Sequence, residues 1–317
     1  MTLTELRYLV NLGKERHFGR AAERSFVSQP TLSVALKKLE DELGVLLFER
    51  VRGEARPTAA GARIIAQAQR VLDAAQTLKD LAREGQDELR GPLRLGAIYT
   101  VGPYLLPRML PALRKRAPQM PLVIEENFTA VLLDQLRNNE LDAALLALPV
   151  RDEQLDSWAL YDEAFTVVLP PGHPWAKQKS IVGKTLAEQP LLLLGPGHCF
   201  RDQVVAACPK CISADDGQPR PHTGSSLETI RQMVASGLGI SVLPQSSMEN
   251  RDRDLGLLHR PFVAPAPSRR VGLIWRKGFT RRRAIQALQA AAVASGLAGV
   301  DWLRTPAPAS LNAARPE

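Results

Sequence analysis

One segment of the sequence, residues 58–88, divides the chain into two unequal parts. It contains no proline, and between Gly61 and Gly85 it contains no glycine, so nothing in it interrupts a long helix. Its apolar residues recur at alternating steps of four and three, the spacing of helices that pack side by side: Ile64, Ala68, Val71, Ala75, Leu78 and Ala82. We therefore expect a linker and dimerisation helix over residues 58–90. Because the seam is short, the alternative is that the helix covers a neighbouring domain.

The part before this helix, residues 1–57, predicts a compact helical domain with a small wing. Small residues at Ala21 and Ala22 allow two helices to cross closely, and Ser28 is a good N-cap for the next helix, which Gly44 ends. That helix has an apolar stripe at the spacing of one buried face: Leu32, Leu36, Leu39 and Leu43. Residues 45–57 can then form two strands with a turn at Gly53. The pattern is that of an all-α winged helix-turn-helix, which places its second helix in the major groove of DNA.

The start of that second helix carries side chains suited to reading DNA. Gln29 can pair with an adenine edge, and the hydroxyl groups beside it can reach bases or phosphates. Basic residues on the helix and the wing can neutralise phosphates. Any single member could instead be a cap or a solvated charge. Together they predict an interface with double-stranded DNA that consists of Ser28, Gln29, Pro30, Thr31, Ser33, Lys37, Arg50 and Arg52.

After the long helix, which Gly91 and Pro92 end, strand-like apolar runs alternate with helical stretches. This alternation predicts α/β layers in a second domain over residues 91–304. The chain is expected to cross into a second lobe near residue 163 and to return near residue 268. The expected lobes are lobe I, residues 91–163 and 268–304, and lobe II, residues 164–267. The tail, residues 305–317, is rich in alanine and proline and is expected to be disordered.

Composition narrows the class of protein further. The chain has 317 residues and a formal net charge of +8, but residues 1–57 hold ten basic and eight acidic residues, so charge alone does not locate the DNA-binding part. No run of eighteen apolar residues occurs, and the start lacks a charged region followed by an apolar one. We therefore expect neither a membrane span nor a signal peptide, and a cytoplasmic location.

The three cysteines, Cys199, Cys208 and Cys211, lie within thirteen residues of one another. A secreted disulfide framework uses more cysteines, spread along the chain, so this cluster indicates metal binding, redox chemistry or packing. Cys208 and Cys211 have the CxxC spacing of zinc sites, but a structural zinc needs a second pair of ligands, which the adjacent His198 and Cys199 supply poorly. We expect neither a metal nor a cofactor.

The surroundings of Cys199 favour a reactive thiolate. A turn at Gly197 precedes it, and an apolar stripe that starts at Phe200 indicates a helix, which places Cys199 in the first helical turn. Helix N-termini stabilise a thiolate, and His198 and Arg201 add hydrogen-bond donors or positive charge. Such a thiolate can attack one oxygen of a peroxide if the departing hydroxide is stabilised. The alternative for each cysteine is a small core residue.

Cys208 lies nine residues after Cys199, just before Pro209, which disfavours further helix. In a continuous helix this separation is roughly 13 Å, and the two side chains face opposite sides. A disulfide needs Cα atoms within about 7 Å of each other. Joining the two sulfurs would therefore require the helix to unwind, so that one oxidation would refold the segment.

Residues 1–60 resemble the winged helix-turn-helix of LysR-type transcriptional regulators. The matching residues are 21–33, 39–44 and 47–50, and residues 237–244 are similar to a segment of the family's effector domains. The resemblance therefore covers about residues 1–300. It implies an α/β effector domain with two lobes, like a periplasmic binding protein, and assembly as a homotetramer that is a dimer of dimers.

Within this family, the Gly-His-Cys sequence, the Arg-Asp pair and the second cysteine nine positions on resemble the members that sense hydrogen peroxide. The resemblance implies that Cys199 is the peroxidatic thiol and Cys208 the resolving thiol, with Cys211 a departure from the pattern. Three neighbours would tune the reactivity of Cys199, namely His198, Arg201 and Asp202. Thr100 and Thr129 match positions that hold peroxide or its water. Alternatively, Thr129 is a helix N-cap and Thr100 an ordinary strand-end residue.

The implied function is that of a transcription factor, expected to be an activator, rather than an enzyme. It would bind promoter DNA, work with RNA polymerase and control oxidative-stress genes, with hydrogen peroxide as the signal and a Cys199–Cys208 disulfide as the switch. One alternative is a regulator of the same type that responds to a small metabolite between the lobes. Another is a thiol peroxidase, which has no use for residues 1–60.

Overall fold

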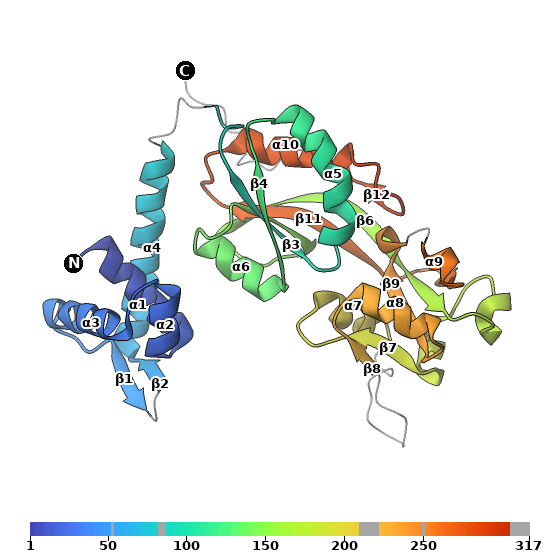
Figure 1. Ribbon diagram of the computed structural model, residues 1–317, viewed down its shortest axis with the longest axis horizontal. Helices are drawn as coiled ribbons and strands as arrows, with labels where there is room; N and C mark the ends of the chain where they lie inside the picture. Colours follow the sequence, from blue (N-terminus) through green and yellow to red (C-terminus); the bar gives the residue numbers. More distant parts are fainter. Residues whose placement is uncertain (52–53, 82–86, 209–221, 249–250, 305–317) are drawn as a thin grey trace. The chain divides into compact units, whose positions relative to one another are not determined.

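The computed structural model describes residues 1–51, 54–81, 87–208, 222–248 and 251–304 (Figure 1). Their contacts divide the chain into two compact units, Met1–Gly85 and Gln86–Glu317. The expected disordered tail, the wing turn at Gly53 and the last seam residue, Ala82, lie outside the described residues. None of the described helices is long and apolar enough to cross a membrane.

The first unit consists of three short helices, a two-stranded wing and a longer helix, as the sequence predicts. Its elements are α1 (Leu3–Glu15), α2 (Phe18–Arg24), α3 (Gln29–Leu43), β1 (Phe48–Val51), β2 (Glu54–Pro57) and α4 (Ala59–Leu81). The side chain of Ser28 caps α3 by accepting a hydrogen bond from the Thr31 amide, and Gly44 ends the helix in the left-handed conformation. The predicted stripe of α3 is buried at Leu32, Leu36 and Leu39.

The long helix α4 belongs to the first unit and packs along α1. A Cβ at Gly13 of α1 would lie 2.9 Å from the tip of the Ile65 side chain, so the two helices approach closely at this glycine. Of the predicted seam, Ala68 is buried, whereas Val71 and Leu78 are exposed, Leu78 to 69%. The unit therefore covers the first part of the seam itself and leaves the later part open.

The second unit is built on a ten-stranded sheet in the order β4-β3-β5-β11-β6-β9-β7-β8, with β10 and β12 also paired to β6. Its strands are β3 (Leu93–Ile98), β4 (Leu122–Asn127), β5 (Ala143–Leu148), β6 (Leu155–Leu169), β7 (Leu191–Leu194), β8 (His222–Gly224), β9 (Ile240–Pro244), β10 (Leu258–Pro261), β11 (Ser268–Arg276) and β12 (Asp301–Trp302). The strand-like apolar runs of the sequence all lie in strands, namely residues 93–98, 122–126, 143–148, 165–169, 191–194, 240–243 and 271–275. Strands β8, β10 and β12 and the first ten residues of β6 lie outside these runs.

Helices flank this sheet. They are α5 (Gly102–Arg116), α6 (Thr129–Arg137), α7 (Cys199–Ala207), α8 (Leu227–Ala235), α9 (Arg251–Asp254) and α10 (Arg282–Val293), with 3-10 turns at Pro174–Lys177, Gly183–Glu188 and Gln245–Ser247. Helices α5 and α10 pack against each other, as Figure 1 shows. The alternation of strands and helices confirms the predicted α/β class.

One long strand, β6, runs through both halves of the second unit. β6 pairs with β11 over Leu155–Ala164, and beyond that point it pairs with β9 and β10. The side of the unit that holds α7 and α8 is therefore joined by β6 to the side that holds α5 and α6 (Figure 1). We use the name lobe I for the side that holds α5 and α6, and lobe II for the side that holds α7 and α8.

Arg281 fastens the entry to the second unit. Its guanidinium donates hydrogen bonds to the carbonyl oxygens of Glu88, Arg90, Gly91 and Pro92 over distances of 2.8–3.2 Å. The five N–H donors of this one side chain thus satisfy four backbone carbonyl groups within residues 88–92. The segment that leads into β3 is consequently held against the start of α10.

Candidate functional site

Cys199 is the first residue of α7, directly after the turn that follows β7. Gly197 in this turn has a φ of +94°, and a Cβ there would lie 3.2 Å from the Phe128 ring, so glycine suits both the backbone and the space. The helix is short, with nine residues, and its N-cap His198 makes no side-chain capping bond. Cys199 is partly buried and is a free thiol. The predicted position of Cys199 in the first helical turn is confirmed.

A cavity of about 10 Å³ lies at this thiol. This volume is at the lower limit for a single water molecule. Its walls come from β3, β4, α6 and the start of α7, and therefore from both lobes. The residues that line it are Ile98, Tyr99, Thr100, Asn127, Phe128, Thr129, Gly197, His198 and Cys199. Four of the seven residues predicted for the redox site thus meet in one place.

The two threonines offer their hydroxyl groups to this cavity. Thr100 is 2% exposed, and its Oγ1 accepts a hydrogen bond from Arg269, which leaves its own hydrogen available for donation. Thr129 Oγ1 is buried and has no hydrogen-bond partner among the described residues. Phe128, and not Thr129, is the N-cap of α6. The capping role considered for Thr129 is therefore wrong, and its unsatisfied hydroxyl suits a small polar guest.

His198 closes the cavity as a neutral ring. Its imidazole packs edge-on against Phe128, with ring centroids 4.9 Å apart, and at a tilt against Tyr99, with ring centroids 5.7 Å apart. Burial lowers the pKa of His198 below its ordinary value of 6.5, and a hydrogen bond with the Ser225 backbone offsets only part of this effect. A neutral imidazole is thus favoured at neutral pH, and the positive charge considered at His198 is not supported.

Arg269, which the sequence analysis missed, supplies the charge near the thiol. It lies on β11, is fully buried, and donates to Glu163 Oε1 at 2.7 Å, to Thr100 Oγ1 at 2.7 Å and to the Thr100 carbonyl at 2.9 Å. Burial by itself disfavours its charge, but Glu163, Tyr161 and Cys199 together raise the pKa of Arg269. Its guanidinium also lies 5.1 Å from the centre of the Phe200 ring.

The network around Arg269 also ties the lobes together at the site. Glu163 Oε2 accepts a hydrogen bond from the Ser246 amide at 3.1 Å, while Arg269 donates a hydrogen bond to Thr100.

The sequence signal for Arg269 is a pair of arginines, Arg269 and Arg270, at the start of a strand. Strand alternation turns one of them inward and the other outward. Which one faces the core depends on the register of the sheet.

Arg201 and Asp202 do not line the cavity. The Arg201 guanidinium donates to the carbonyl oxygen of Leu194 at 2.9 Å, which fastens α7 to the end of β7. Asp202 is exposed in the first turn of α7, where its negative charge interacts favourably with the helix dipole. Both residues therefore support the helix that presents Cys199, and neither is placed to touch a guest in the cavity.

Cys208 lies at the opposite end of α7, where it is the C-cap and is 2% exposed. It is disulfide-bonded, whereas Cys199 is free, so the two are not joined to each other in this structure. With α7 intact, their positions are about 13 Å apart along the helix, beyond the reach of a disulfide. Cys211 lies outside the described residues.

Five of the eight residues predicted to contact DNA lie at the start of α3, Lys37 lies further along the helix, and two belong to the wing. Gln29, Pro30 and Lys37 are exposed, and Ser33 is half-buried. Ser28 and Thr31 are exposed too, but their hydroxyls bond to each other at 2.8 Å, so capping already engages both. The side chain of Arg50 and all of Arg52 lie outside the described residues.

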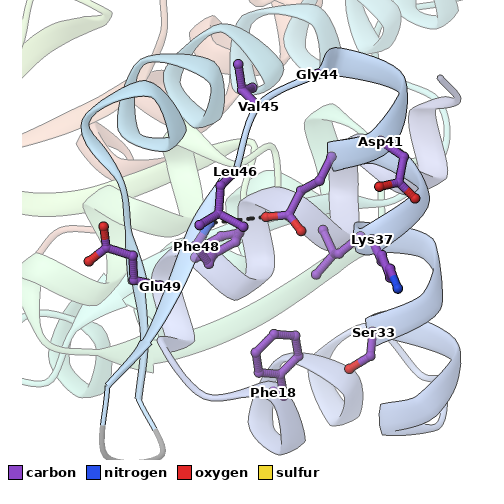
Figure 2. Close-up of a pocket in the computed structure, with 11 residues that line it drawn as sticks. Phe18, Ser33, Lys37, Asp41, Gly44, Val45, Leu46, Phe48 and Glu49 are labelled. Carbon is purple, nitrogen blue, oxygen red and sulfur yellow. Dashed lines mark hydrogen bonds between the residues drawn. The ribbon is translucent and has the colours of Figure 1, made fainter.

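A groove of about 890 Å³ separates α3 from the first wing strand, and Ser33 and Lys37 lie along its helical side (Figure 2). Acidic side chains, Asp41 and Glu49, line it as well. At its base the Glu40 carboxylate accepts hydrogen bonds from the amides of Leu47 and Phe48, at 2.7 Å and 3.3 Å. This contact fixes the wing strand relative to the helix that carries the DNA-facing residues.

Comparison with known protein families covers both units. The model described as "Bacterial regulatory helix-turn-helix protein, lysR family" matches residues 3–62, and that described as "LysR substrate binding domain" matches residues 86–296. The chain belongs to the LysR family of transcriptional regulators. The resemblance seen in the sequence is thereby confirmed, as is the fold class of a helix-turn-helix unit followed by an α/β regulatory unit.

Among the relatives of this regulator is the DNA-binding transcriptional dual regulator OxyR of Escherichia coli K12, which is 40% identical over 88% of this chain and 90% of its own. A full-length cysteine-to-aspartate variant of OxyR from Pseudomonas aeruginosa matches in structure with a TM-score of 0.70, 52% identity and coverage of 92% and 97% of the two chains. A cysteine variant of OxyR from Corynebacterium glutamicum with hydrogen peroxide bound has a TM-score of 0.58, 35% identity and coverage of 93% and 95%.

Proposed function

We propose that this regulator senses hydrogen peroxide through oxidation of Cys199 and a following Cys199–Cys208 disulfide, and that it thereby controls oxidative-stress genes. The observation that carries the proposal is the cavity at Cys199. At about 10 Å³ it limits any guest to about the size of water, a class that includes hydrogen peroxide but not organic metabolites, whose pockets measure roughly 300–1,000 Å³. Relatives named as hydrogen peroxide-inducible activators, and one solved with hydrogen peroxide bound, support the same reading.

The oxidation step has defined electron and proton movements. The Cys199 thiolate attacks one peroxide oxygen, an S–O bond forms as the O–O bond breaks, and the sulfur becomes a sulfenic acid. The second oxygen leaves as hydroxide and takes a proton to become water. In this proposal Thr100 and Thr129, which line the cavity, hold the peroxide, and Arg269 fixes the Thr100 hydroxyl by donating a hydrogen bond to it.

The second step, disulfide formation, changes the structure of α7. The Cys208 thiolate attacks the sulfenic sulfur of Cys199, a disulfide forms, and the oxygen leaves as water. Because the two cysteines lie at opposite ends of α7, this bond requires the helix to unwind. The step also requires Cys208 as a thiol, so the cycle starts from protein in which the disulfide at Cys208 has been reduced.

The working form is proposed to be a cytoplasmic homotetramer, a dimer of dimers, that binds double-stranded promoter DNA and acts on RNA polymerase as an activator. The exposed seam residues Val71 and Leu78 of α4 support self-association, since exposed apolar residues at heptad spacing gain stability by packing against a second helix. No cofactor enters this scheme. Hydrogen peroxide is the signal and is consumed in stoichiometric amounts.

Thiol counting on the full-length protein tests the proposal. The protein is first reduced, then freed of reductant and treated with one equivalent of hydrogen peroxide. We expect the loss of two thiols and a peptide pair joined through Cys199 and Cys208 by mass spectrometry. Cys199→Ser, the matched control, should lose this response and retain DNA binding in the reduced state. The proposal fails if Cys199 stays reduced while a metabolite changes DNA binding, or if the Cys199→Ser protein responds normally.

A further inference from the structure

Val34 occupies the outermost position of α3. The buried face of this helix is formed by Leu32, Leu36 and Leu39. Successive residues of an α-helix are rotated by about 100° around its axis, so the Val34 side chain lies almost directly opposite the middle of that buried face. Consistent with this placement, Val34 is 69% exposed. Pro30 lies one turn before it and Lys38 one turn after it on the same side, and both are exposed.

In the free protein this is a poor place for valine. Valine is a weaker helix former than alanine, lysine or glutamine, and its apolar side chain gains nothing from water. Between Gln29 and Lys38, all of which the structure describes, Val34 is the one exposed large apolar side chain. A partner that covers it would have to offer an apolar group in the middle of a polar surface.

The surface around Val34 identifies that partner as duplex DNA. Gln29 and the half-buried Ser33 precede Val34 on α3, and Lys37 and Lys38 follow it, so hydrogen-bonding and cationic groups flank Val34, with Pro30 the other apolar side chain on that side. The major groove presents the complementary pattern: polar base edges, flanking phosphates and one kind of apolar group, the 5-methyl of thymine. Valine has no donor or acceptor with which to contact a phosphate or another base edge.

We propose that Val34 reads a thymine in each half-site of the operator by packing against its 5-methyl group. The inference rests on the proposed entry of α3 into the major groove, and it adds a specificity-determining residue to the polar set at the start of the helix. Val34 would thereby discriminate the T·A pair from the other pairs at one position, where the polar residues alone would be tolerant.

Removal of the methyl group from DNA tests this contact directly. The full-length protein first selects its preferred sequences from a pool of random-sequence duplexes. Each thymine of the selected duplex is then replaced, one at a time, by deoxyuridine, which lacks only the 5-methyl group. For one thymine per half-site we expect binding to weaken roughly fourfold, the affinity equivalent of one lost buried methyl(ene) group.

The same replacement is then made with Val34→Ala, which loses two methyl groups and retains a strong helix former. At the sensitive thymine, Val34→Ala should bind the thymine and deoxyuridine duplexes equally. Val182→Ala, at a valine of the second unit that is 50% exposed, should retain the fourfold preference. If no thymine is sensitive, or if Val34→Ala retains the preference, the inference is overturned while DNA binding stands. If the wild-type chain selects no sequence at all, the DNA-binding function fails and the inference fails with it.

Discussion

Helices α3 and α7 both carry proposed functional residues in their first turns, but they differ in length and in how their ends are capped. α3 has fifteen residues, a side-chain cap at Ser28 and a left-handed Gly44 at its end. α7 has nine residues, no side-chain cap at His198, and Cys208 at its end. The first is stabilised from within, at both ends, whereas the second depends on groups elsewhere in the fold.

This difference matches the two proposed tasks. A helix that reads DNA must keep its side chains in a constant relation to the groove, so local capping is useful. A helix that must unwind to join its two ends needs a low local stability, which a short and weakly capped element provides. The stability of α7 is instead supplied by Arg201, which bonds to Leu194, and by Arg269 next to Phe200.

The largest effect on stability is expected for Arg269→Ala. This change leaves Glu163 buried without its charge partner and should reduce the free energy of unfolding of the second unit by about 3–5 kcal/mol. All four tryptophans, Trp158, Trp175, Trp275 and Trp302, lie in that unit, so urea unfolding followed by tryptophan fluorescence reports on it specifically.

The neighbouring arginine offers a matched control. Arg270 pairs with Asp162 on the surface, where solvent screens the interaction, and Arg270→Ala should leave the urea midpoint almost unchanged. Equal midpoints for the two variants would contradict the role of the buried network.

A smaller effect is expected at the cap of α3. Ser28→Ala removes the hydrogen bond to the Thr31 amide and should cost about 1 kcal/mol, which corresponds to roughly fivefold faster hydrogen exchange of the α3 amides in the native state. Ser28→Asp keeps a capping oxygen and should restore protection, while its negative charge weakens DNA binding. Unchanged exchange in Ser28→Ala would show that α3 does not depend on this cap.

The smallest effect is a dependence on pH that originates at the start of α7. Because burial lowers the pKa of His198 in the folded protein, the unfolded chain binds a proton more readily between that pKa and the ordinary value of 6.5. This histidine therefore makes the second unit less stable as the pH falls below about 6.5, and it has no such effect above that value. His198→Gln should show a smaller fall in urea midpoint between about pH 7.5 and pH 5.5 than the wild type. An equal fall in both proteins would remove His198 as its source.

The sequence by itself determined the local features. Caps and glycines set the ends of α3, periodicity identified its buried face, and the turn at Gly197 placed Cys199 in the first turn of α7. Each of these signals lies within one turn or one helix of the residue that it positions, so neighbouring residues suffice to determine the backbone there.

Only the tertiary structure decided what surrounds Cys199. Thr100 and Arg269 lie 169 residues apart in the chain, and they meet because β11 pairs with β5 and β6 in one register of the sheet. A shift of one residue would have turned Arg270 inward in place of Arg269. The neutral state of His198 is likewise set by burial against Phe128 and Tyr99, which come from other elements. Local patterns carry no record of such contacts, because strand register and burial are properties of the assembled sheet.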